Sequence, residues 1–507
     1  MVFRKLGILN LAAFLFLTAC TQHPPLLNPP PPVDRLTAEI RVIFDDPAFA
    51  NAFWGVLIQS LDNGEIIFRE NEYKGFLPSS NMKLFTSAAA FALLPRNFRF
   101  QTQLFHTGYV DEDSILQGDL IIRGVGDPSL GRQIAGESDQ TNGNLSVFYA
   151  WADSITLAGI KAISGKIIGD DNYFEDEPLG RGWAWDDQSY CYSAQISALS
   201  FHENCIDLVL MPADSIGGIA ACRILPDANF IEVECKVKTT GPGTESRIFC
   251  TRKPNTNHVL VEGCICIEDS EVVENATIDN PTKYAACVFK TVLEARGFPV
   301  EGPALDIDEL TDFSYTRSDT NRLVDYQSPP IKEIIKTTNK SSQNLYAELI
   351  FRTLSVNKSG MGDQKLSAQQ IEDFLSGIGI NPGHIIIADG SGLSRRNLVT
   401  PKQITALLRY IHSQPYFNDF YESLPIAGVD GTLKNRMRGT RAEGNVRAKT
   451  GTLGGVAVLS GYVTSEDGEL FAFSMIANNH TVPVSLVRQA QDLVCERLAN
   501  FSRNKAF

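Results

Sequence analysis

The sequence predicts an α+β fold: one antiparallel sheet covered by helices, built from both ends of the chain and interrupted by a large insertion. Residues 35–69 carry a helical pattern and then two strand patterns, and residues 470–501 carry a strand pattern and then an amphipathic helix. The span from residue 84 to residue 341 is far longer than any loop in a compact domain, so it must be inserted structure.

The terminal elements can be placed in order along the chain. A helical pattern covers residues 35–53, and a proline near its end is expected to break it. Apolar runs at 54–60 and 65–69 flank an Asp-Asn-Gly turn, which favours a hairpin. Near the C-terminus we expect a strand over residues 470–477 and a helix over residues 485–501.

A serine and a lysine three residues apart form the first candidate for catalysis. Ser80 and Lys83 precede an alanine-rich apolar run at residues 84–90, which indicates a buried helix. Residues i and i+3 share one helix face, so Lys83 would lie over Ser80. An amine held away from water loses proton affinity and can act as a base, which would make Ser80 a nucleophile. Alone this S-x-x-K spacing is weak, because it is common by chance in a long chain.

Two later motifs strengthen this interpretation. Ser342 and Asn344 form an S-x-N motif where a helical run opens, and Lys449, Thr450 and Gly451 form a K-T-G motif before a β-branched run. Each tripeptide is weak alone. The order S-x-x-K, S-x-N, K-T-G resembles the set found in penicillin-binding proteins and serine β-lactamases, and the three together are a strong signal.

The insertion has patterns of its own. Strand patterns at 120–124 and 165–169 flank a helical run at 146–158. Residues 205–273 are rich in Val, Ile, Thr and Cys with frequent turn signals, which predicts a small β-rich unit. A helical pattern returns at 281–297.

The pattern of the first 20 residues predicts a signal peptide for export. Residues 1–20 contain two basic residues and then an apolar run that is too short to span a membrane. The end of this run, Leu-Thr-Ala-Cys, resembles the lipobox of bacterial lipoproteins, so Cys20 would carry the lipid; an ordinary signal peptide is the alternative. Residues 21–33 are proline-rich and predict an extended tether. Thr21 in place of aspartate points, by resemblance to enteric lipoprotein sorting, to the outer membrane.

Composition narrows the possible functions. The 507 residues, 43 % hydrophobic and 21 % charged, fit a globular protein of two or three domains. A net charge of −14 argues against nucleic acid as a partner, and no P-loop or Rossmann pattern is present. Eight of the ten cysteines lie between Cys191 and Cys287. The histidines do not join them at zinc spacings, so we expect disulfides and no metal or other cofactor.

With these motifs assembled, the chain is similar to the class C low-molecular-mass penicillin-binding proteins, D-alanyl-D-alanine carboxypeptidases that are also D,D-endopeptidases. Segments at 124–128, 389–395 and 424–433 match the family, as does the long insertion, which ordinary β-lactamases lack. The resemblance implies a penicillin-binding, serine β-lactamase-like transpeptidase domain with two smaller β-rich inserted domains. The implied boundaries are residues 34–86 and 313–507 for the peptidase domain, 87–204 and 274–312 for domain II, and 205–273 for domain III.

The resemblance also implies a serine acyl-enzyme mechanism. Ser80 would attack the carbonyl between two D-alanine residues, and Lys83 would take its proton. Ser342 would relay a proton to the leaving amine, and Asn344 would hold the substrate amide and Lys83. β-Lactams would mimic the substrate and stall as acyl-enzymes.

The third motif is implied in substrate binding. Lys449 and Thr450 would bind the substrate carboxylate, which a cation and a hydroxyl suit. Gly451 and Thr452 follow Thr450 in the sequence and are also expected to bind the substrate. The backbone N–H groups of Ser80 and Thr452 would form the oxyanion hole.

A subsite for the diaminopimelate side chain is the finest detail that the resemblance suggests. Asp187, Tyr192 and Arg395 match its positions, and an acid and an arginine suit a zwitterionic centre. The alternative is equally weighted: Trp183 and Trp185 would be core residues, and Asp187 would be a turn residue.

The resemblance also implies disulfides, binding partners and a cellular location. The spacings resemble disulfides Cys191–Cys205 and Cys250–Cys264. Partners would be peptidoglycan stem peptides, β-lactams and, through the lipid, a membrane; the site would face the periplasm of a bacterial envelope. The rivals are a β-lactamase or esterase on the same machinery and a catalytically silent envelope scaffold.

Overall fold

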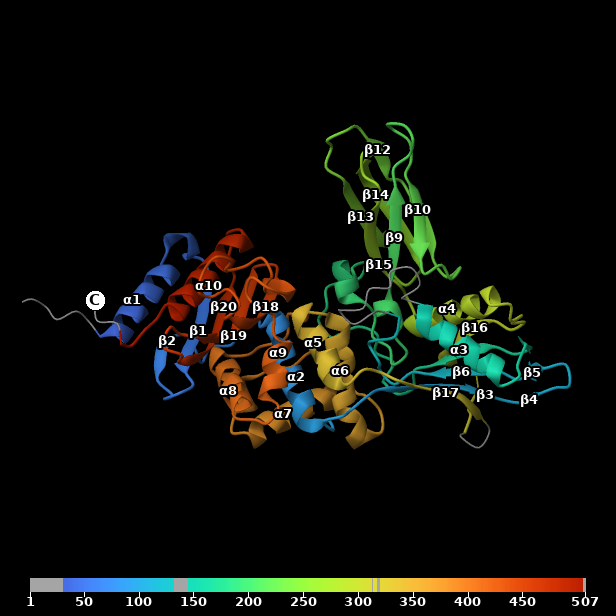
Figure 1. Ribbon diagram of the computed structural model, residues 1–507, viewed down its shortest axis with the longest axis horizontal. Coiled ribbons are helices and arrows are strands. Elements are labelled where there is room, and N and C mark those ends of the chain that lie inside the picture. The colour runs from blue at the N-terminus through green and yellow to red at the C-terminus, as the bar shows by residue number, and fades with distance from the viewer. Residues whose placement is uncertain (1–30, 132–144, 312, 317–319, 505–507) are drawn as a thin grey trace, which may run out of the picture.

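The computed structural model describes residues 31–131, 145–311, 313–316 and 320–504, and it has the α+β architecture expected from the sequence. One end of the molecule is built around a five-stranded antiparallel sheet in the order β18-β19-β20-β1-β2 (Figure 1). Its strands are β1 (Phe53–Ser60), β2 (Ile66–Glu70), β18 (Arg447–Leu453), β19 (Val456–Thr464) and β20 (Leu470–Asn478). The first and last strands of the chain therefore lie side by side.

Helices cover both faces of this sheet. On one face lie α1 (Pro32–Phe44) and α10 (Val484–Ala499), which share an apolar core with the strands. The predicted tether is two residues too long, because Pro32 and Val33 already belong to α1 and proline fits a first helical turn. The other face is covered by α2 (Met82–Leu93), α5 (Ile331–Lys340), α6 (Asn344–Ser359), α7 (Gln364–Gly377), α8 (Pro401–His412) and α9 (Phe417–Ser423).

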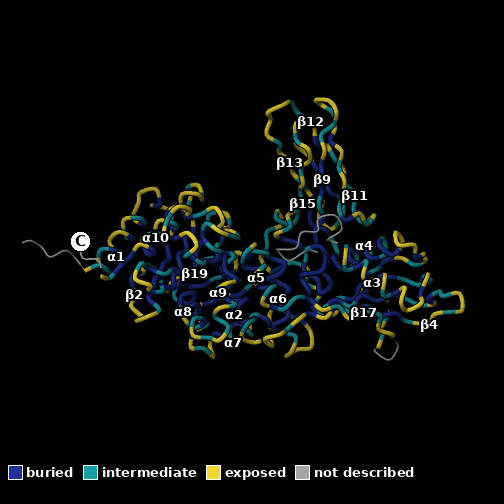
Figure 2. The backbone as a smooth tube through the Cα atoms, in the orientation of Figure 1, coloured by how far each residue is buried: buried dark blue, intermediate teal, exposed yellow. Residues whose placement is uncertain are grey.

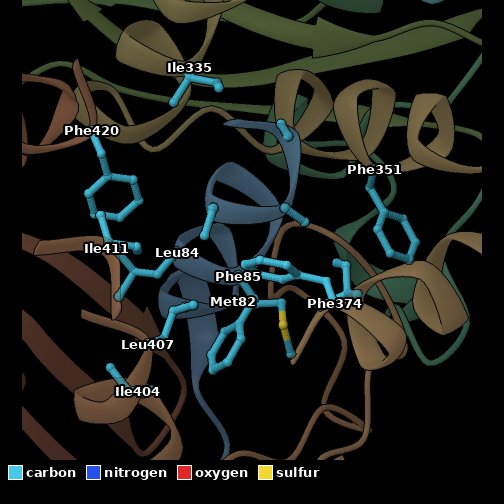
Figure 3. Packing of buried hydrophobic residues seen from close by; sticks show 14 of the residues in the cluster. Met82, Leu84, Phe85, Ile335, Phe351, Phe374, Ile404, Leu407, Ile411 and Phe420 are labelled. Atoms are coloured by element: carbon cyan, nitrogen blue, oxygen red, sulfur yellow. The ribbon is translucent and has the colours of Figure 1, made fainter. Parts of the chain in front are cut away.

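Helix α2 lies in the middle of this second helical layer. Met82, Leu84 and Phe85 are completely buried, on different sides of the helix. A helix that is apolar all round belongs in a core. Figure 3 shows its neighbours, which come from the five helices α5 to α9: Ile335, Phe351, Phe374, Ile404, Leu407, Ile411 and Phe420. This packing fixes the position of Ser80 and Lys83 at the start of α2.

The insertion begins with a second five-stranded sheet, in the order β16-β8-β6-β3-β17, which mixes parallel and antiparallel pairs. It packs against α3 (Ser146–Leu157) and α4 (Pro281–Ala295). Strand β17 lies within the range predicted for the peptidase domain, yet it pairs with β3, so the chain re-enters the helical layer only at α5. The strands of this sheet are β3 (Gln101–His106), β6 (Leu120–Arg123), β8 (Ile167–Asp170), β16 (Ala304–Asp306) and β17 (Asn321–Gln327). A separate three-stranded sheet contains β4 (Tyr109–Val110), β5 (Ile115–Gln117) and β7 (Ala162–Ile163).

Strands β9 to β15 form a β-rich projection (Figure 1). Its two sheets enclose a buried strip between exposed edges and turns (Figure 2). The strands are β9 (Cys205–Met211), β10 (Ala221–Leu225), β11 (Glu232–Cys235), β12 (Lys238–Thr240), β13 (Arg247–Arg252), β14 (His258–Cys266) and β15 (Val272–Thr277).

The cysteines of this region correct one prediction. The structure contains the Cys191–Cys205 disulfide, but Cys250 and Cys264 are free thiols. In the ladder between β13 and β14, Cys250 lies opposite Val261, three residues before Cys264. At about 3.3 Å per residue this offset alone is about 10 Å, which exceeds the reach of a disulfide. The Cys250–Cys264 pairing is therefore wrong.

Across the described residues, none of the helices is both long and apolar enough to cross a bilayer. The predicted signal peptide and Cys20 lie outside the described residues.

Candidate active site

Ser80 sits in a single 3₁₀ turn, Ser79–Asn81, that leads into α2. The side-chain amide of Asn81 donates to the backbone oxygen of Lys449 at 3.0 Å, which ties this turn to β18. A side chain at Gly451 would lie only 3.0–3.1 Å from the backbone of this turn and Ser79 Cβ. The glycine of the K-T-G motif is thus what lets β18 approach the nucleophile so closely.

Lys83 is fully buried one helical turn after Ser80. Its Nζ donates to Ser80 Oγ at 3.1 Å, to Asn344 Oδ1 at 2.6 Å and to the backbone oxygen of Ser391 at 2.8 Å. Burial lowers the pKa of Lys83 to about 7, against the opposing charges of Asp389 and Glu348. A base with this pKa is poised to take a proton from a hydroxyl at neutral pH.

A second lysine and serine face the first pair. Lys449 Nζ, also fully buried, donates to Ser342 Oγ at 2.8 Å. Burial and the neighbouring Lys83 hold the pKa of Lys449 well below its usual value. Among the described residues, no acid opposes these two effects on Lys449, so an anion that entered here would supply a counter-charge. Thr450 Oγ1 donates to Thr432 Oγ1 at 2.7 Å, so a pair of threonine hydroxyls lies next to Lys449 in the sequence and can also bind an anion.

Ser80 and Ser342 line one cleft of about 450 Å³, together with the three residues of the predicted side-chain subsite. The buried Lys83 and Lys449 do not line this cleft but contact these two serines. Ser80, Ser342, Asn344 and Thr452 therefore share a cavity with Asp187, Tyr192 and Arg395, although the sequence separates them by up to 372 positions, from residue 80 to residue 452. The other lining residues are Ser79, Gly182, Ala184, Gly392, Leu393, Leu453 and Gly454.

The comparison with known families decides what this arrangement is. The D-Ala-D-Ala carboxypeptidase 3 (S13) family matches residues 36–499. The chain belongs to this family. It is 34 % identical over 483 residues to a D-alanyl-D-alanine carboxypeptidase of Actinomadura sp., which covers 93 % of this chain and 86 % of the relative.

Solved structures agree with this membership of the S13 family. The crystal structure of penicillin binding protein 4 from Haemophilus influenzae superposes with a TM-score of 0.76 at 28 % identity, and covers 92 % of this chain and 99 % of that one. The same protein complexed with a β-lactam superposes with a TM-score of 0.72 at 26 % identity, with the same coverage. The fold expected from the motifs is thereby confirmed.

Two buried carboxylates behind the lysine of this S13 site were not found from the sequence. Glu348 accepts from the backbone N–H groups of Gly390 at 3.2 Å and Ser391 at 2.8 Å, and burial raises its pKa to about 7. Asp389 is fully buried and accepts four N–H donors. The spacing of Glu348, four residues after Asn344 on α6, is the signal that would have placed it on the site-facing side.

Asp187 and Arg395, the two charged residues of the predicted side-chain subsite, each have a hydrogen-bond partner within the protein. The Tyr192 hydroxyl donates to Asp187 Oδ1 at 2.7 Å, and the Tyr192 ring stacks on Tyr190. Burial and Asp187 raise the pKa of this tyrosine, so it stays a neutral donor. Arg395 Nη2 donates to the backbone oxygen of Gly454 at 3.1 Å. Asp187 therefore lines the cleft with one carboxylate oxygen already bound to the tyrosine hydroxyl.

The two tryptophans of the competing interpretation differ from one another. Trp185 is 80 % exposed, so it is no core residue. Trp183 is half-buried and packs with Leu345 and Leu349 of α6.

A group of acids lies elsewhere in the insertion. Asp171, Asp306 and Asp308 each offer one oxygen within 4.8 Å of the others, a spacing that could hold a cation. Burial and the charge of Asp306 raise the pKa of Asp171 to about 7, which weakens it as an anionic ligand at neutral pH. None of the three lines the cleft around Ser80.

Proposed function

We propose that this S13 enzyme is a peptidoglycan D,D-peptidase, which removes terminal D-alanine from stem peptides and hydrolyses D-Ala-diaminopimelate cross-links. One observation carries the proposal: a buried lysine with a lowered pKa lies 3.1 Å from the hydroxyl of Ser80, and Ser80 lines a cleft together with Ser342, which accepts a hydrogen bond from Lys449. Hydroxyl, base and a second proton carrier are the parts that acyl transfer to serine needs.

The proposed reaction has two halves. Lys83 takes the hydroxyl proton of Ser80 as Oγ attacks the carbonyl of the penultimate D-alanine. The tetrahedral intermediate collapses, the amide bond breaks, and Ser342 passes its proton to the leaving amine while it takes one from Lys449, whose Nζ contacts Ser342 Oγ at 2.8 Å. Water then attacks the ester and gives up a proton that restores Lys449, while Lys83 returns its proton to Ser80 Oγ as the ester bond breaks.

Binding groups flank the reacting carbonyl. Lys449, Thr450 and the neighbouring Thr432 would hold the terminal carboxylate of a carboxypeptidase substrate, where the buried ammonium lacks a counter-charge. The backbone N–H groups of Ser80 and Thr452 would stabilise the oxyanion. β-Lactams carry a carboxylate and a strained amide and would acylate Ser80 in the same way.

Digestion of purified muropeptides, monomeric and cross-linked, tests this function. We expect mass spectrometry to detect loss of D-alanine from pentapeptide monomers and cleavage of cross-linked dimers. Rapid turnover of nitrocefin without any muropeptide cleavage would instead identify a β-lactamase, and failure to label with fluorescent penicillin would identify a silent scaffold.

Asp187→Ala tests the side-chain subsite. The carboxylate of Asp187 would bind the free amine of diaminopimelate through a charge-assisted hydrogen bond, and remote binding of this kind lowers the barrier at the scissile bond. We expect turnover of diaminopimelate peptides to fall roughly tenfold to a hundredfold, since such bonds are worth about 1.5–3 kcal/mol. Acylation by benzylpenicillin, which has no such side chain, should not change. Equal losses on both substrates would show that Asp187 is structural.

The proposed location is the periplasmic side of the envelope, with a lipid on Cys20 as the anchor to the outer membrane. The lipobox-like sequence before Cys20 supports this assignment. In cells, the wild-type protein should partition with membranes and begin at a lipid-modified Cys20, and Cys20→Ser should remain uncleaved and unlipidated. Fractionation, metabolic palmitate labelling and N-terminal mass mapping measure this; a wholly soluble wild-type protein with another N-terminus would contradict it.

A further inference from the structure

A segment of the insertion, residues 181–192, docks directly onto the catalytic half of the molecule. Ser394 Oγ donates to the backbone oxygen of Arg181 at 2.6 Å. Asn344 Nδ2 donates to the backbone oxygen of Tyr192 at 2.7 Å, while the same amide accepts from Lys83 through Oδ1. The two ends of this segment are therefore fixed to the peptidase domain, and one of them is fixed to a residue that contacts the base.

Between these ends, Trp183 makes a contact that the proposed reaction does not use. Its indole Nε1–H donates to Asp389 Oδ2 at 3.0 Å, across a separation of 206 residues. Its ring packs with residues from both halves, including Phe174 and Leu349. Gly182 and Ala184 on either side line the cleft, but Trp183 does not. Trp183 thus faces the buried acid instead of a substrate.

Asp389 depends on this contact because it is fully buried. Its Oδ1 accepts from Gly392 N at 2.8 Å and Asn397 Nδ2 at 2.7 Å, and its Oδ2 accepts from Ser394 N at 2.6 Å and from the indole. Three of the four donors belong to the loop that contains Asp389 itself. The fourth comes from the insertion. A buried carboxylate that loses a donor bears a large desolvation cost, so the loop would rearrange to replace it.

That loop holds the base. Ser391, two residues after Asp389, offers the backbone oxygen that Lys83 Nζ contacts at 2.8 Å. A side chain at Gly392 would overlap the backbone oxygen of Ser79, so the loop lies in direct contact with the nucleophile turn. A small shift of this loop therefore moves an acceptor of Lys83 and the turn that carries Ser80.

We propose that Trp183 is a positioning residue for acylation, because its indole N–H completes the donor set of Asp389 and so fixes the loop that holds Lys83. The insertion is then part of the machinery that activates the nucleophile, beyond any role in binding stem-peptide side chains. This inference rests on the proposed acyl-transfer function.

The test is Trp183→Phe in the full-length mature protein, which keeps an aromatic ring and deletes the donor. Stopped-flow acylation by benzylpenicillin gives the dissociation constant of the initial complex and the acylation rate constant per labelled site. We expect the rate constant to fall roughly tenfold to a hundredfold with the dissociation constant unchanged, the size of effect of a lost hydrogen bond to a charged group. Trp185→Phe, a change of the exposed tryptophan two residues away, is the matched control and should acylate like the wild type.

Three outcomes would overturn the inference: wild-type rates in Trp183→Phe, a change confined to the dissociation constant, or the same fall in Trp185→Phe. Loss of folded protein lowers the labelled fraction and not the rate per labelled site, so the two are read separately. If Trp183→Phe does not fold, incorporation of benzothienylalanine at position 183, in which sulfur replaces the indole N–H, makes the same deletion in an isosteric ring. Acylation of the wild-type enzyme is measured first. If benzylpenicillin does not acylate the wild type, the proposed function itself is refuted.

Discussion

Ser80→Ala should abolish covalent labelling by fluorescent penicillin and all release of D-alanine, because it removes the only atom that can form the ester. The fold should survive, since one oxygen is deleted and Lys83 keeps its contacts with Asn344 and the Ser391 carbonyl at 2.6 and 2.8 Å. Gel fluorescence and thermal unfolding measure the two effects.

The matched control for this change lies on the same helix. Ser87 is buried on α2 and donates to Asn339 Oδ1, away from the cleft. Ser87→Ala also deletes one oxygen and should still be labelled. Label that survives in Ser80→Ala would mean that another serine carries the acyl group.

Lys83→Met should slow acylation by about a hundredfold to ten-thousandfold, the usual contribution of a general base. Methionine keeps an unbranched side chain of similar length in the buried site but cannot take the proton. In the wild type, only the neutral amine of Lys83 can act, so the acylation rate should rise with pH through about 7, the pKa that burial gives this lysine. The variant should lose this rise.

Second-order acylation constants measured from about pH 5 to about pH 9 test both statements. Lys74→Met, at an exposed lysine before the nucleophile turn, should keep the wild-type rate and profile. A wild-type profile that is flat around pH 7, or a Lys83→Met profile that keeps the rise, would assign the base to another group.

Local geometry explains which parts of the site could be predicted from the sequence. The Ser80–Lys83 contact follows from the i, i+3 spacing of one turn, and the apolar run after it identified the buried helix. The sheet could be predicted because both ends of the chain carry strand patterns next to an amphipathic helix, which together make one helix-covered sheet. The family resemblance then predicted that Ser342 and Asp187 share the cleft with Ser80, and that Lys449, which contacts Ser342, lies beside them.

The missing parts depend on contacts that no local pattern encodes. The carboxylate of Asp389 is held by Trp183 from 206 residues away, and a buried acid looks like any other acid in a sequence. The Cys250–Cys264 pairing failed because spacing says nothing about register, and register sets Cys250 against Val261. Strand β17 was assigned to the wrong side of a boundary because its partner β3 lies more than 200 residues earlier.

The position of β1 inside the sheet has a consequence for how this protein is made. Strand β1 is hydrogen-bonded on one side to β2 and on the other to β20, from Phe53 opposite Asn478 to Ser60 opposite Phe471. Its second partner therefore leaves the ribosome more than 400 residues after β1 itself. The insertion closes mostly over shorter separations and can fold while synthesis continues, but the nucleophile's own domain stays open until the C-terminus arrives. During that interval β1 presents an unpaired, apolar edge, which is the kind of surface that aggregates. Chaperones that hold the chain during synthesis thus have a defined segment to shield, and loss of β20 would leave that edge open permanently.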